Sequence, residues 1–292
     1  MERVVCADNL AVLAGLGGDS VPLIYIDPPF NTGGTQQRRT LETRADADGD
    51  RNGFGGRRYS SQLLSAMAYE DSFDDYLGFL APRLQEAHRV LADEGTLYVH
   101  LDPRESHYVK VLLDEVFGRD CFLNEIVWAY DFGGRSKRRW PAKHDTILVY
   151  VKDPKRYWFD SAEVDREPYM APGLVGPEKA ERGKLPTDVW WHTIVPTSGS
   201  EKTGYPTQKP EGVLRRIVTA SSRPGDLCLD FFAGSGTLGA VARELGRGFL
   251  LVDSNPEAID VIERRLGITA ERPAPAEDDA VAQMDAGAAA SE

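Results

Sequence analysis

Four nearly continuous apolar runs along the chain indicate buried strands. They cover residues 21–26, 96–101, 227–232 and 248–252. Because polar residues hardly interrupt them, these runs lack the alternation of a strand with one solvent-exposed face. Such runs are typical of parallel strands that are covered on both sides. The pattern therefore predicts the interior of a parallel sheet.

Helical patterns separate these runs. The clearest pattern places the following apolar residues on one helical face: Leu77, Leu80, Leu84, Ala87 and Leu91. Ser72 precedes it as the expected N-cap, with Asp75 in the capping-box position. Further helices are expected at residues 9–16, 104–117 and 237–245 and after Asn255. Strands that alternate with helices predict an α/β fold.

Two additional strand patterns occur at residues 124–130 and 145–151. A short basic connection, residues 133–144, joins them. Two strands with so short a connection pair in an antiparallel way. We therefore expect a hairpin at one edge of the sheet.

The chain is expected to form one domain over residues 1–268, with two irregular parts. Residues from about 31 to 70 contain few large aliphatic side chains, so we expect a flexible loop there. Residues from about 155 to 205 are rich in proline and aromatic residues, which suggests a small insertion without a core of its own. The Ala, Pro, Asp and Glu composition of residues 269–292 predicts a disordered acidic tail.

The charge of the chain is unevenly distributed. The net charge over 292 residues is −12, which is unusual for a protein that binds phosphate backbones. Residues 271–292 carry six acids and one arginine, whereas residues 133–158 carry eight Lys or Arg and two Asp. The acidic balance argues against tight nonspecific coating of DNA. It leaves room for a localised basic cleft.

Neither a membrane span nor a metal site is expected. The chain has no uncharged apolar run of about 18 or more residues, and its N-terminus lacks the apolar core of a signal peptide. A cytoplasmic location is the default expectation. Cys6, Cys121 and Cys228 are far apart, and the five histidines show no ligand spacing with them. This favours reduced thiols and no bound metal.

A glycine-rich turn follows the apolar run at residues 227–232. It contains Gly234, Gly236 and Gly239 in the spacing G-x-G-x-x-G. Asp253 ends the next strand, 19 residues after Gly234, where an acid can bind ribose hydroxyls. The motif favours a nucleotide-like ligand over a purely structural turn. It does not decide between a nicotinamide dinucleotide and S-adenosylmethionine.

The tetrapeptide Asp27-Pro28-Pro29-Phe30 directly follows another buried strand. One interpretation is a rigid strand terminator, since proline cannot donate to a ladder. The other is catalytic. The carboxylate of Asp27 and the carbonyl of Pro28 can accept both hydrogens of an exocyclic amine, whose nitrogen then attacks more readily. Phe30 offers a flat apolar wall on which an extruded base can stack.

Together these motifs resemble the β class of S-adenosylmethionine-dependent amino-group DNA methyltransferases, which modify adenine N6 or cytosine N4. The resemblance rests on residues 27–33, on Thr207-Gln208-Lys209-Pro210 and on residues 230–237. The catalytic turn comes before the cofactor loop, which is the circularly permuted motif order of that class. The resemblance implies a Rossmann-like fold: a doubly wound, mostly parallel, seven-stranded sheet with an antiparallel edge hairpin.

The resemblance also implies roles for individual residues. Asp27, Pro28, Pro29 and Phe30 would be catalytic, and the cofactor would be S-adenosyl-L-methionine. Cofactor contacts would come from Asp8 at the adenine, Thr207 and Lys209 at the methionine end, Asp253 at the ribose, and Asp230, Phe232, Ala233, Gly234, Ser235, Gly236 and Thr237 along the loop. Phe30 stands where this class usually has tyrosine, which keeps stacking but removes a hydroxyl.

Double-stranded DNA is the implied substrate, and a basic segment is the candidate contact surface. The segment combines phosphate-binding charges with one aromatic ring: Arg135, Lys137, Arg138, Arg139, Trp140 and Lys143. A solvated hairpin tip is the alternative for each of them. Arg38 and Arg39 lie in the loop after the catalytic turn, which we expect to close over a flipped base. A homodimer and a partner restriction endonuclease are both possible.

Other functions are considered as well. An Asp-initiated tetrapeptide favours adenine N6, with cytosine N4 as the alternative. A methyltransferase for RNA or protein amino groups more often has Asn at the first position. An inactive DNA-binding subunit would not need an intact Asp27 and glycine turn, and an oxidoreductase would leave the tetrapeptide unexplained. The leading interpretation requires Asp27 and Ser235 to share a pocket.

Overall fold

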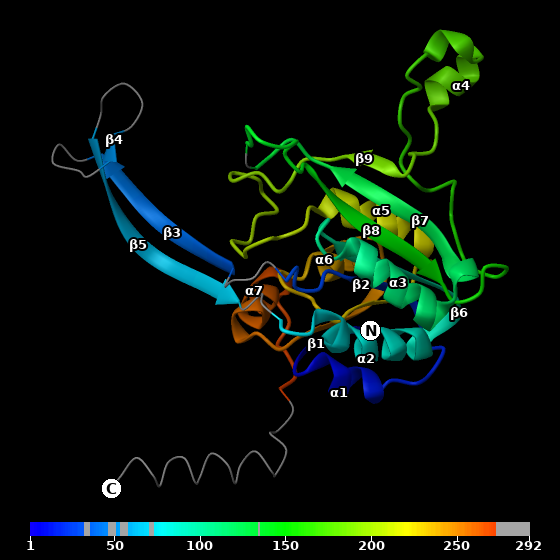
Figure 1. The fold of residues 1–292 in the computed structure, drawn as a ribbon, viewed down its shortest axis with the longest axis horizontal. Helices are drawn as coiled ribbons and strands as arrows, with labels where there is room; N and C mark the ends of the chain where they lie inside the picture. The colour runs from blue at the N-terminus through cyan, green and yellow to red at the C-terminus, as the bar shows by residue number, and fades with distance from the viewer. Residues whose placement is uncertain (32–35, 46–50, 53–57, 70–72, 134, 273–292) are drawn as a thin grey trace, which may run out of the picture.

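The computed structural model describes residues 1–31, 73–133 and 135–272, together with the backbone of residues 36–45, 51–52 and 58–69. Its centre is one eight-stranded sheet (Figure 1). The strand order is β1 (Glu2–Cys6), β11 (Gly248–Asp253), β10 (Leu227–Asp230), β2 (Val21–Ile26), β6 (Leu91–Leu101), β8 (His144–Val151), β7 (Phe122–Ala129) and β9 (Val189–Trp191). The first five are parallel neighbours, and β8 is antiparallel to both β6 and β7.

The predicted α/β fold with a mostly parallel sheet is confirmed, with two corrections. The sheet has eight strands and not seven, because β9 pairs in parallel with β7. The β7–β8 hairpin is therefore not the outermost pair. With only three residues, β9 is too short to produce a periodic pattern. Strand β1 was not predicted, because its first two residues are the charged Glu2 and Arg3.

Helices cover both faces of the sheet (Figure 1). One face carries α1 (Asn9–Ala14), α2 (Tyr76–Val90) and α3 (Ser106–Phe117), whereas α5 (Glu211–Ser221), α6 (Thr237–Glu244) and α7 (Pro256–Leu266) pack on the other. The central strand shows why its run is apolar throughout. Leu23 packs with α5 to α7, and Ile24 packs with α1 to α3. Successive side chains of a strand point to opposite faces, and here both faces are buried.

The start of α2 confirms its helical pattern and moves its cap. Asp75 is the N-cap, and its carboxylate accepts a hydrogen bond from the backbone N–H of Gly78 at 2.8 Å. Ser72, the expected cap, lies outside the described residues. Pro82 lies within the helix. The buried face of α2 includes Leu80 and Leu84.

Residues 36–45, 51–52 and 58–69 form a second sheet where we expected an irregular loop. Its strands are β3 (Gln36–Ala45), β4 (Arg51–Asn52) and β5 (Arg58–Tyr69), in the order β3-β5-β4. In Figure 1 this arm extends away from the body. Cross-strand backbone pairing can hold such an arm without the half-buried apolar face on which the strand prediction depended. The expected flexibility of this segment remains a prediction.

The insertion at residues 155–205 contains the 3₁₀ turn η3 (Pro172–Leu174), the short helix α4 (Pro177–Arg182) and β9. Figure 1 shows α4 projecting away from the sheet. Of its two adjacent tryptophans, Trp190 is buried and Trp191 is 78% exposed. Another 3₁₀ turn, η2 (Arg119–Cys121), connects α3 to β7.

The predicted start of the tail at residue 269 is too early. The backbone N–H of Glu271 donates to the carbonyl of Val4, and the carbonyl of Glu271 accepts from Cys6 N–H, both at 2.8 Å. Arg3 also pairs with the Glu271 carboxylate. The chain therefore stays packed against β1 through Arg272. The rest of the predicted tail, residues 273–292, lies outside the described residues.

Within the described part of the chain, no helix is long and apolar enough to cross a membrane.

The parallel strands all end at one edge of the sheet, and β8 begins there because Thr146 pairs with Leu101 at the end of β6. Loops that leave this edge can therefore meet in space. This is where ligands bind in open α/β sheets.

Candidate active site

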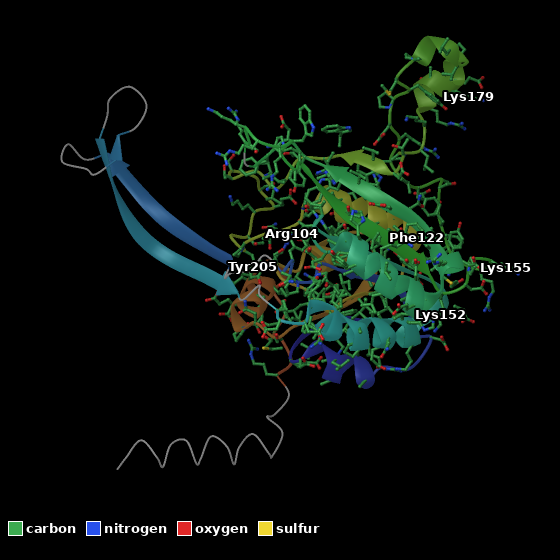
Figure 2. The ribbon with its side chains drawn as sticks, in the orientation of Figure 1. Arg104, Phe122, Lys152, Lys155, Lys179 and Tyr205 are labelled. Carbon is green, nitrogen blue, oxygen red and sulfur yellow. The ribbon has the colours of Figure 1, made fainter. Side chains whose placement is uncertain are left out.

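A cavity of about 420 Å³ lies at the carboxyl ends of β2, β10 and β11. Tyr205, one of its lining residues, is labelled in Figure 2 at the side of the sheet from which the β3–β5 arm extends. Lys155, which follows β8, lies at the opposite side in the same view. The lining includes these sequence-predicted residues: Asp8, Asp27, Pro28, Pro29, Phe30, Thr207, Lys209, Asp230, Phe232, Ala233, Gly234, Ser235, Thr237 and Asp253.

The carboxylate of Asp27 has two oxygens in different environments. Oδ2 accepts a hydrogen bond from Nζ of Lys209, which is itself buried. Oδ1 is buried and has no hydrogen-bond partner among the described residues. A buried carboxylate oxygen without a donor costs free energy, so this atom is a ready acceptor for an incoming N–H group.

Phe30 forms an apolar wall next to this carboxylate. Nζ of Lys209 lies 4.7 Å from the centre of the Phe30 ring. The following residue, Asn31, has a positive φ of 52°, which asparagine tolerates better than most residues. Its side-chain amide donates to Glu105 at 2.9 Å and accepts from Phe73 N–H at 3.1 Å. The turn after β2 is therefore fixed on both sides.

In the glycine turn between β10 and α6, each of the three glycines has a different environment. Gly234 has φ +50° and lines the cavity, and a Cβ there would come within 3.3 Å of the Tyr205 ring. Gly236 has φ +71° and packs tightly on Ile262, which leaves it outside the cavity lining. Gly239 packs against Leu251 of β11. One glycine therefore faces the cavity, and the other two permit close packing.

Two acids under the glycine turn shape it. Asp230 accepts from Phe232 N–H at 2.9 Å, and Asp253 accepts from Gly234 N–H at 2.8 Å. Burial, together with the charges of Asp27 and Asp253, raises the pKa of Asp230 well above its ordinary value. Burial also raises the pKa of Asp253, although backbone N–H groups oppose that shift. Asp253 keeps lone pairs for a further donor, because each carboxylate oxygen can accept two hydrogen bonds.

The segment before α5 brings Lys209 into the cavity. Thr207 has a positive φ of 56°, an uncommon conformation for a threonine. The side chain of Gln208 accepts from both the backbone and the hydroxyl of Thr203, at 2.8 and 2.9 Å. The carbonyl of Lys209 accepts from the Thr237 hydroxyl at 3.1 Å. This last bond joins the segment to the first turn of α6.

The opposite end of the cavity contains an arginine that sequence reasoning missed. Arg83 of α2 donates to Asn9 Oδ1 at 2.6 Å and to Asp8 Oδ2 at 3.1 Å, and it lies 3.9 Å over the Phe79 ring. Asp8 also caps α1 by accepting from Leu10 N–H at 2.9 Å. Asp8 therefore has a structural role as N-cap, whatever ligand it contacts.

Aromatic side chains near this end were also missed. Phe73 and Phe79 stack at 4.6 Å, and Phe232 lies 6.0 Å from Phe79. All three line the cavity, as does Tyr205. A phenylalanine pair that flanks a helix N-cap also fits ordinary core packing, so no sequence pattern distinguishes these residues as ligand contacts.

The basic connection, of which residues 133 and 135–144 are described, lies at the same edge of the sheet as the cavity. Five of its six candidates are exposed, Trp140 by 95%, while Lys143 is half-buried and donates to Gly133 O at 3.1 Å. Among the described residues, none of its arginines or lysines forms an ion pair. For Arg38 and Arg39 only the backbone in β3 is described, and their side chains lie outside the description.

The cavity fits a nucleoside ligand with a polar tail. Its volume falls within the range of about 300–1,000 Å³ that is usual for small-molecule sites. Aromatic rings and Arg83 line one end, acids lie under the glycine turn, and Lys209 lies at the other end near Asp27. Such a layout offers separate surfaces for a base, a ribose and a charged tail.

Comparison with known proteins gives a consistent result. A family model described as DNA methylase, of the N6/N4 methyltransferase type, matches residues 21–264. The type II methyltransferase M.HpaI of Haemophilus parainfluenzae is 30% identical over 267 residues, which cover 91% of this chain and 74% of that protein. The DNA adenine methyltransferase YhdJ of Escherichia coli (strain K12) is 33% identical over 275 residues, 91% of this chain and 83% of that protein.

Solved structures support the same fold. The complex of M1.HpyAVI with SAM superimposes with a TM-score of 0.58 at 20% identity, covering 92% of this chain and 100% of that one. The cytosine-N4-specific PvuII DNA methyltransferase gives a TM-score of 0.63 at 13% identity, covering 96% and 89%. At these identities the likeness concerns the fold alone.

Proposed function

The chain belongs to the N6/N4 family of DNA methylases, and from this premise we propose that it methylates N6 of a target adenine in double-stranded DNA. It is a DNA amino-methyltransferase, and its methyl donor is S-adenosylmethionine. The choice of adenine and the roles of individual residues are the proposal. The observation that carries it is that Asp27 and the Gly234 turn line one cavity, in which the buried Asp27 Oδ1 has no hydrogen-bond donor among the described residues.

The proposed roles at the cofactor follow the layout of the cavity. Asp253 binds the ribose hydroxyls while it holds Gly234, and the ring cluster around Phe79 packs against the cofactor adenine. Asp8 is fixed by Arg83 next to that cluster. When bound, the cofactor supplies an electrophilic methyl group on a positively charged sulfur.

The proposed roles at the target base follow from the tetrapeptide. Asp27 Oδ1 and the Pro28 carbonyl accept the two amino hydrogens, which makes the amino nitrogen a better nucleophile. Lys209 donates to Asp27 Oδ2 and holds the carboxylate in one orientation. Phe30 stacks on the flipped base, which helps to offset the cost of unstacking it. Asp27 is also placed to accept the proton that the methylated nitrogen must lose.

Support for adenine comes from the tetrapeptide and from one relative. The tetrapeptide begins with Asp27, and the relative that is 33% identical is named as a DNA adenine methyltransferase. Cytosine N4 is the alternative, because its exocyclic amine presents the same two hydrogens to Asp27. The cavity geometry serves both bases.

The proposed DNA contacts are the basic connection and the β3–β5 arm. Arg135, Lys137, Arg138 and Arg139 are free to bind phosphates because they form no ion pair among the described residues. Trp140 projects into solvent next to them and can stack on an exposed base or wedge into the duplex. Arg38 and Arg39 remain candidates on β3.

A transfer experiment tests the proposal directly. The purified chain is mixed with tritium-methyl-labelled S-adenosylmethionine and unmethylated plasmid DNA, and the DNA is digested to nucleosides. We expect the label in N6-methyl-2′-deoxyadenosine. Label in N4-methylcytosine would replace adenine by cytosine, and label only in RNA or in protein controls would contradict DNA as the substrate.

Partners beyond DNA are separate parts of the proposal. The type II name of the relative M.HpaI supports a restriction endonuclease of matching specificity. We also propose a homodimer and a cytoplasmic location, where DNA is at hand. Light scattering after size-exclusion chromatography tests the dimer, and a monomer at micromolar concentration would exclude it.

A further inference from the structure

A buried chain of polar side chains crosses four strands beside the catalytic turn. It consists of Tyr25 of β2, His100 of β6, Asp145 of β8 and Tyr130, which directly follows β7; we call it the His100 network. Tyr25 Oη lies 2.9 Å from His100 Nδ1, and His100 Nε2 lies 3.2 Å from Asp145 Oδ2. The Tyr130 hydroxyl donates to Asp145 Oδ1 at 3.0 Å.

The His100 network is deeply buried. His100 has an exposed fraction of 0%, Tyr25 of 2% and Asp145 of 8%. Removing such polar groups from water costs free energy, and well-packed apolar residues often stabilise a fold as well or better. Fold stability alone is therefore a poor reason for this network.

The network lies directly under the proposed target-base site. Tyr25 lines the cavity and precedes Asp27 by two residues. The His100 ring lies 6.1 Å from the Phe30 ring and 5.4 Å from Trp128, which packs edge-on against it. His100 thus contacts the wall on which the base stacks and, through Tyr25, the strand that carries Asp27.

The hydrogens of the network have a definite direction. Burial alone raises the pKa of Asp145, but hydrogen bonds from His100 and Tyr130 and the charge of Lys209 bring it below its ordinary value. An ionised carboxylate only accepts, so His100 Nε2 carries a hydrogen. In the tautomer that carries its hydrogen on Nε2 alone, His100 Nδ1 accepts the hydrogen bond from the Tyr25 hydroxyl. Burial and the charge of Asp27 raise the pKa of Tyr25 well above its ordinary value, so its hydroxyl keeps a hydrogen to donate.

This direction matters for Asp27. A hydroxyl that donates to His100 points its hydrogen away from the end of β2. The buried Oδ1 of Asp27 then stays available for the amino group of the base. If His100 carried its hydrogen on Nδ1, Tyr25 would have to accept that hydrogen and turn its own towards another group.

We propose that His100 is a positioning residue for methyl transfer: with Asp145 it orients the Tyr25 hydroxyl and supports the Phe30 ring, so that Asp27 and Phe30 hold the target amine in line for attack. This inference rests on the proposed function. It adds residues that do not touch the reacting atoms and act through Tyr25 and Phe30.

The test separates positioning from folding by steady-state kinetics. His100→Phe keeps an aromatic ring, somewhat larger than imidazole, and removes both hydrogen bonds, whereas Asp145→Asn favours the opposite tautomer of His100. We expect each variant to lower kcat for methyl transfer to DNA about 100-fold, the size of effect that a small misplacement produces. The KM for the cofactor and the Kd for S-adenosylhomocysteine should stay within about twofold of the wild type.

A matched control removes a similar bond elsewhere on the same strand. Tyr98 lies two residues before His100 in β6, is 3% exposed and forms a hydrogen bond with Ser221 at 2.7 Å. Tyr98→Phe should lower Tm and leave kcat unchanged. Tyr25→Phe combined with His100→Phe should be no slower than His100→Phe alone, because both changes break one chain.

The outcomes are distinguishable. If wild-type chain transfers no methyl group to DNA, the proposed function fails and this inference with it. If the wild type is active and His100→Phe keeps its kcat while Tm falls, the His100 network is only structural and the inference alone is overturned. Multiplicative losses in the Tyr25 and His100 double variant would also contradict a single chain.

Discussion

The cavity and the basic connection lie at the same edge of the sheet, but their charged side chains differ in burial and in ion pairing. In the cavity, Asp27 and Lys209 are largely buried and paired with each other. In the connection, Arg138 and Arg139 are exposed and form no ion pair among the described residues. Under the proposed function, the cavity performs the methyl transfer and the basic connection binds the DNA backbone.

The two regions should therefore respond differently to substitution. A fixed, water-excluded group acts on the transition state, so its loss should cost a large factor in kcat. An exposed cation acts through screened attraction, so its loss should cost a small factor in affinity that depends on salt. Each prediction below either breaks or sharpens this contrast.

The largest effect is expected at Asp27. Asp27→Asn replaces an acceptor oxygen with an amide and removes the partner of Lys209, so kcat should fall by about 10²- to 10³-fold. Binding of S-adenosylhomocysteine, measured by calorimetry, should stay within about threefold. Asp114→Asn is the matched control, because Asp114 also pairs with a lysine but lies on α3, away from the cavity. If Asp114→Asn lowers kcat equally, the contrast between the regions fails.

The next effect is expected at Gly234. Gly234→Ala places a Cβ 3.3 Å from the Tyr205 ring at a φ of +50°, so the Kd for S-adenosylhomocysteine should rise about 10-fold. Gly225→Ala creates similar backbone strain at φ +90°, with nothing within 4 Å of the new Cβ. That control should lower Tm without changing the Kd. Equal Kd values for the two variants would contradict a contact between Gly234 and the cofactor.

A smaller effect is expected in the basic connection. Arg138→Ala should weaken duplex binding about two- to fivefold and reduce the slope of log K against log salt by about one, as for one lost phosphate contact. The kcat at saturating DNA should not change. Lys155→Ala is the control, since Lys155 is exposed at the opposite side of the sheet (Figure 2). If both variants bind equally, the connection is a solvated hairpin tip.

The smallest effect is expected at the C-terminus. A chain that ends at Arg272 keeps the pairing of Glu271 with β1 and should match the full chain in kcat and Tm. A chain that ends at Ile268 loses that pairing and the Arg3 ion pair, so its Tm should fall by a few degrees. A loss of activity in the longer truncation product would assign a role to residues 273–292.

The sequence revealed the chemistry-bearing parts better than the periphery, for a physical reason. Asp27 and Gly234 lie at ends of strands that are buried on both faces, and a continuous apolar run marks such a strand clearly. Parallel strands end at one edge, so the shared cavity of these two residues could be inferred before any coordinates were known. The strands β9 and β3–β5 pair through backbone groups, which leave little trace in side-chain patterns.

Other site residues could not be found from sequence because only the fold brings them together. Arg83 reaches Asp8 from a different helix, 75 positions along the chain. His100 and Asp145 looked like ordinary polar residues within strands until pairing of β6 with β8 placed them side by side. Motif spacing records neighbours along the chain, whereas these contacts cross it.

The most direct test of the account is a crystal structure of the chain with S-adenosylhomocysteine. We expect the thioether sulfur to face Asp27, the ribose hydroxyls to reach Asp253 and the ligand to lie against Gly234. A ligand bound away from this cavity, or with its sulfur turned away from Asp27, would contradict the claim that the tetrapeptide and the glycine turn serve one reaction.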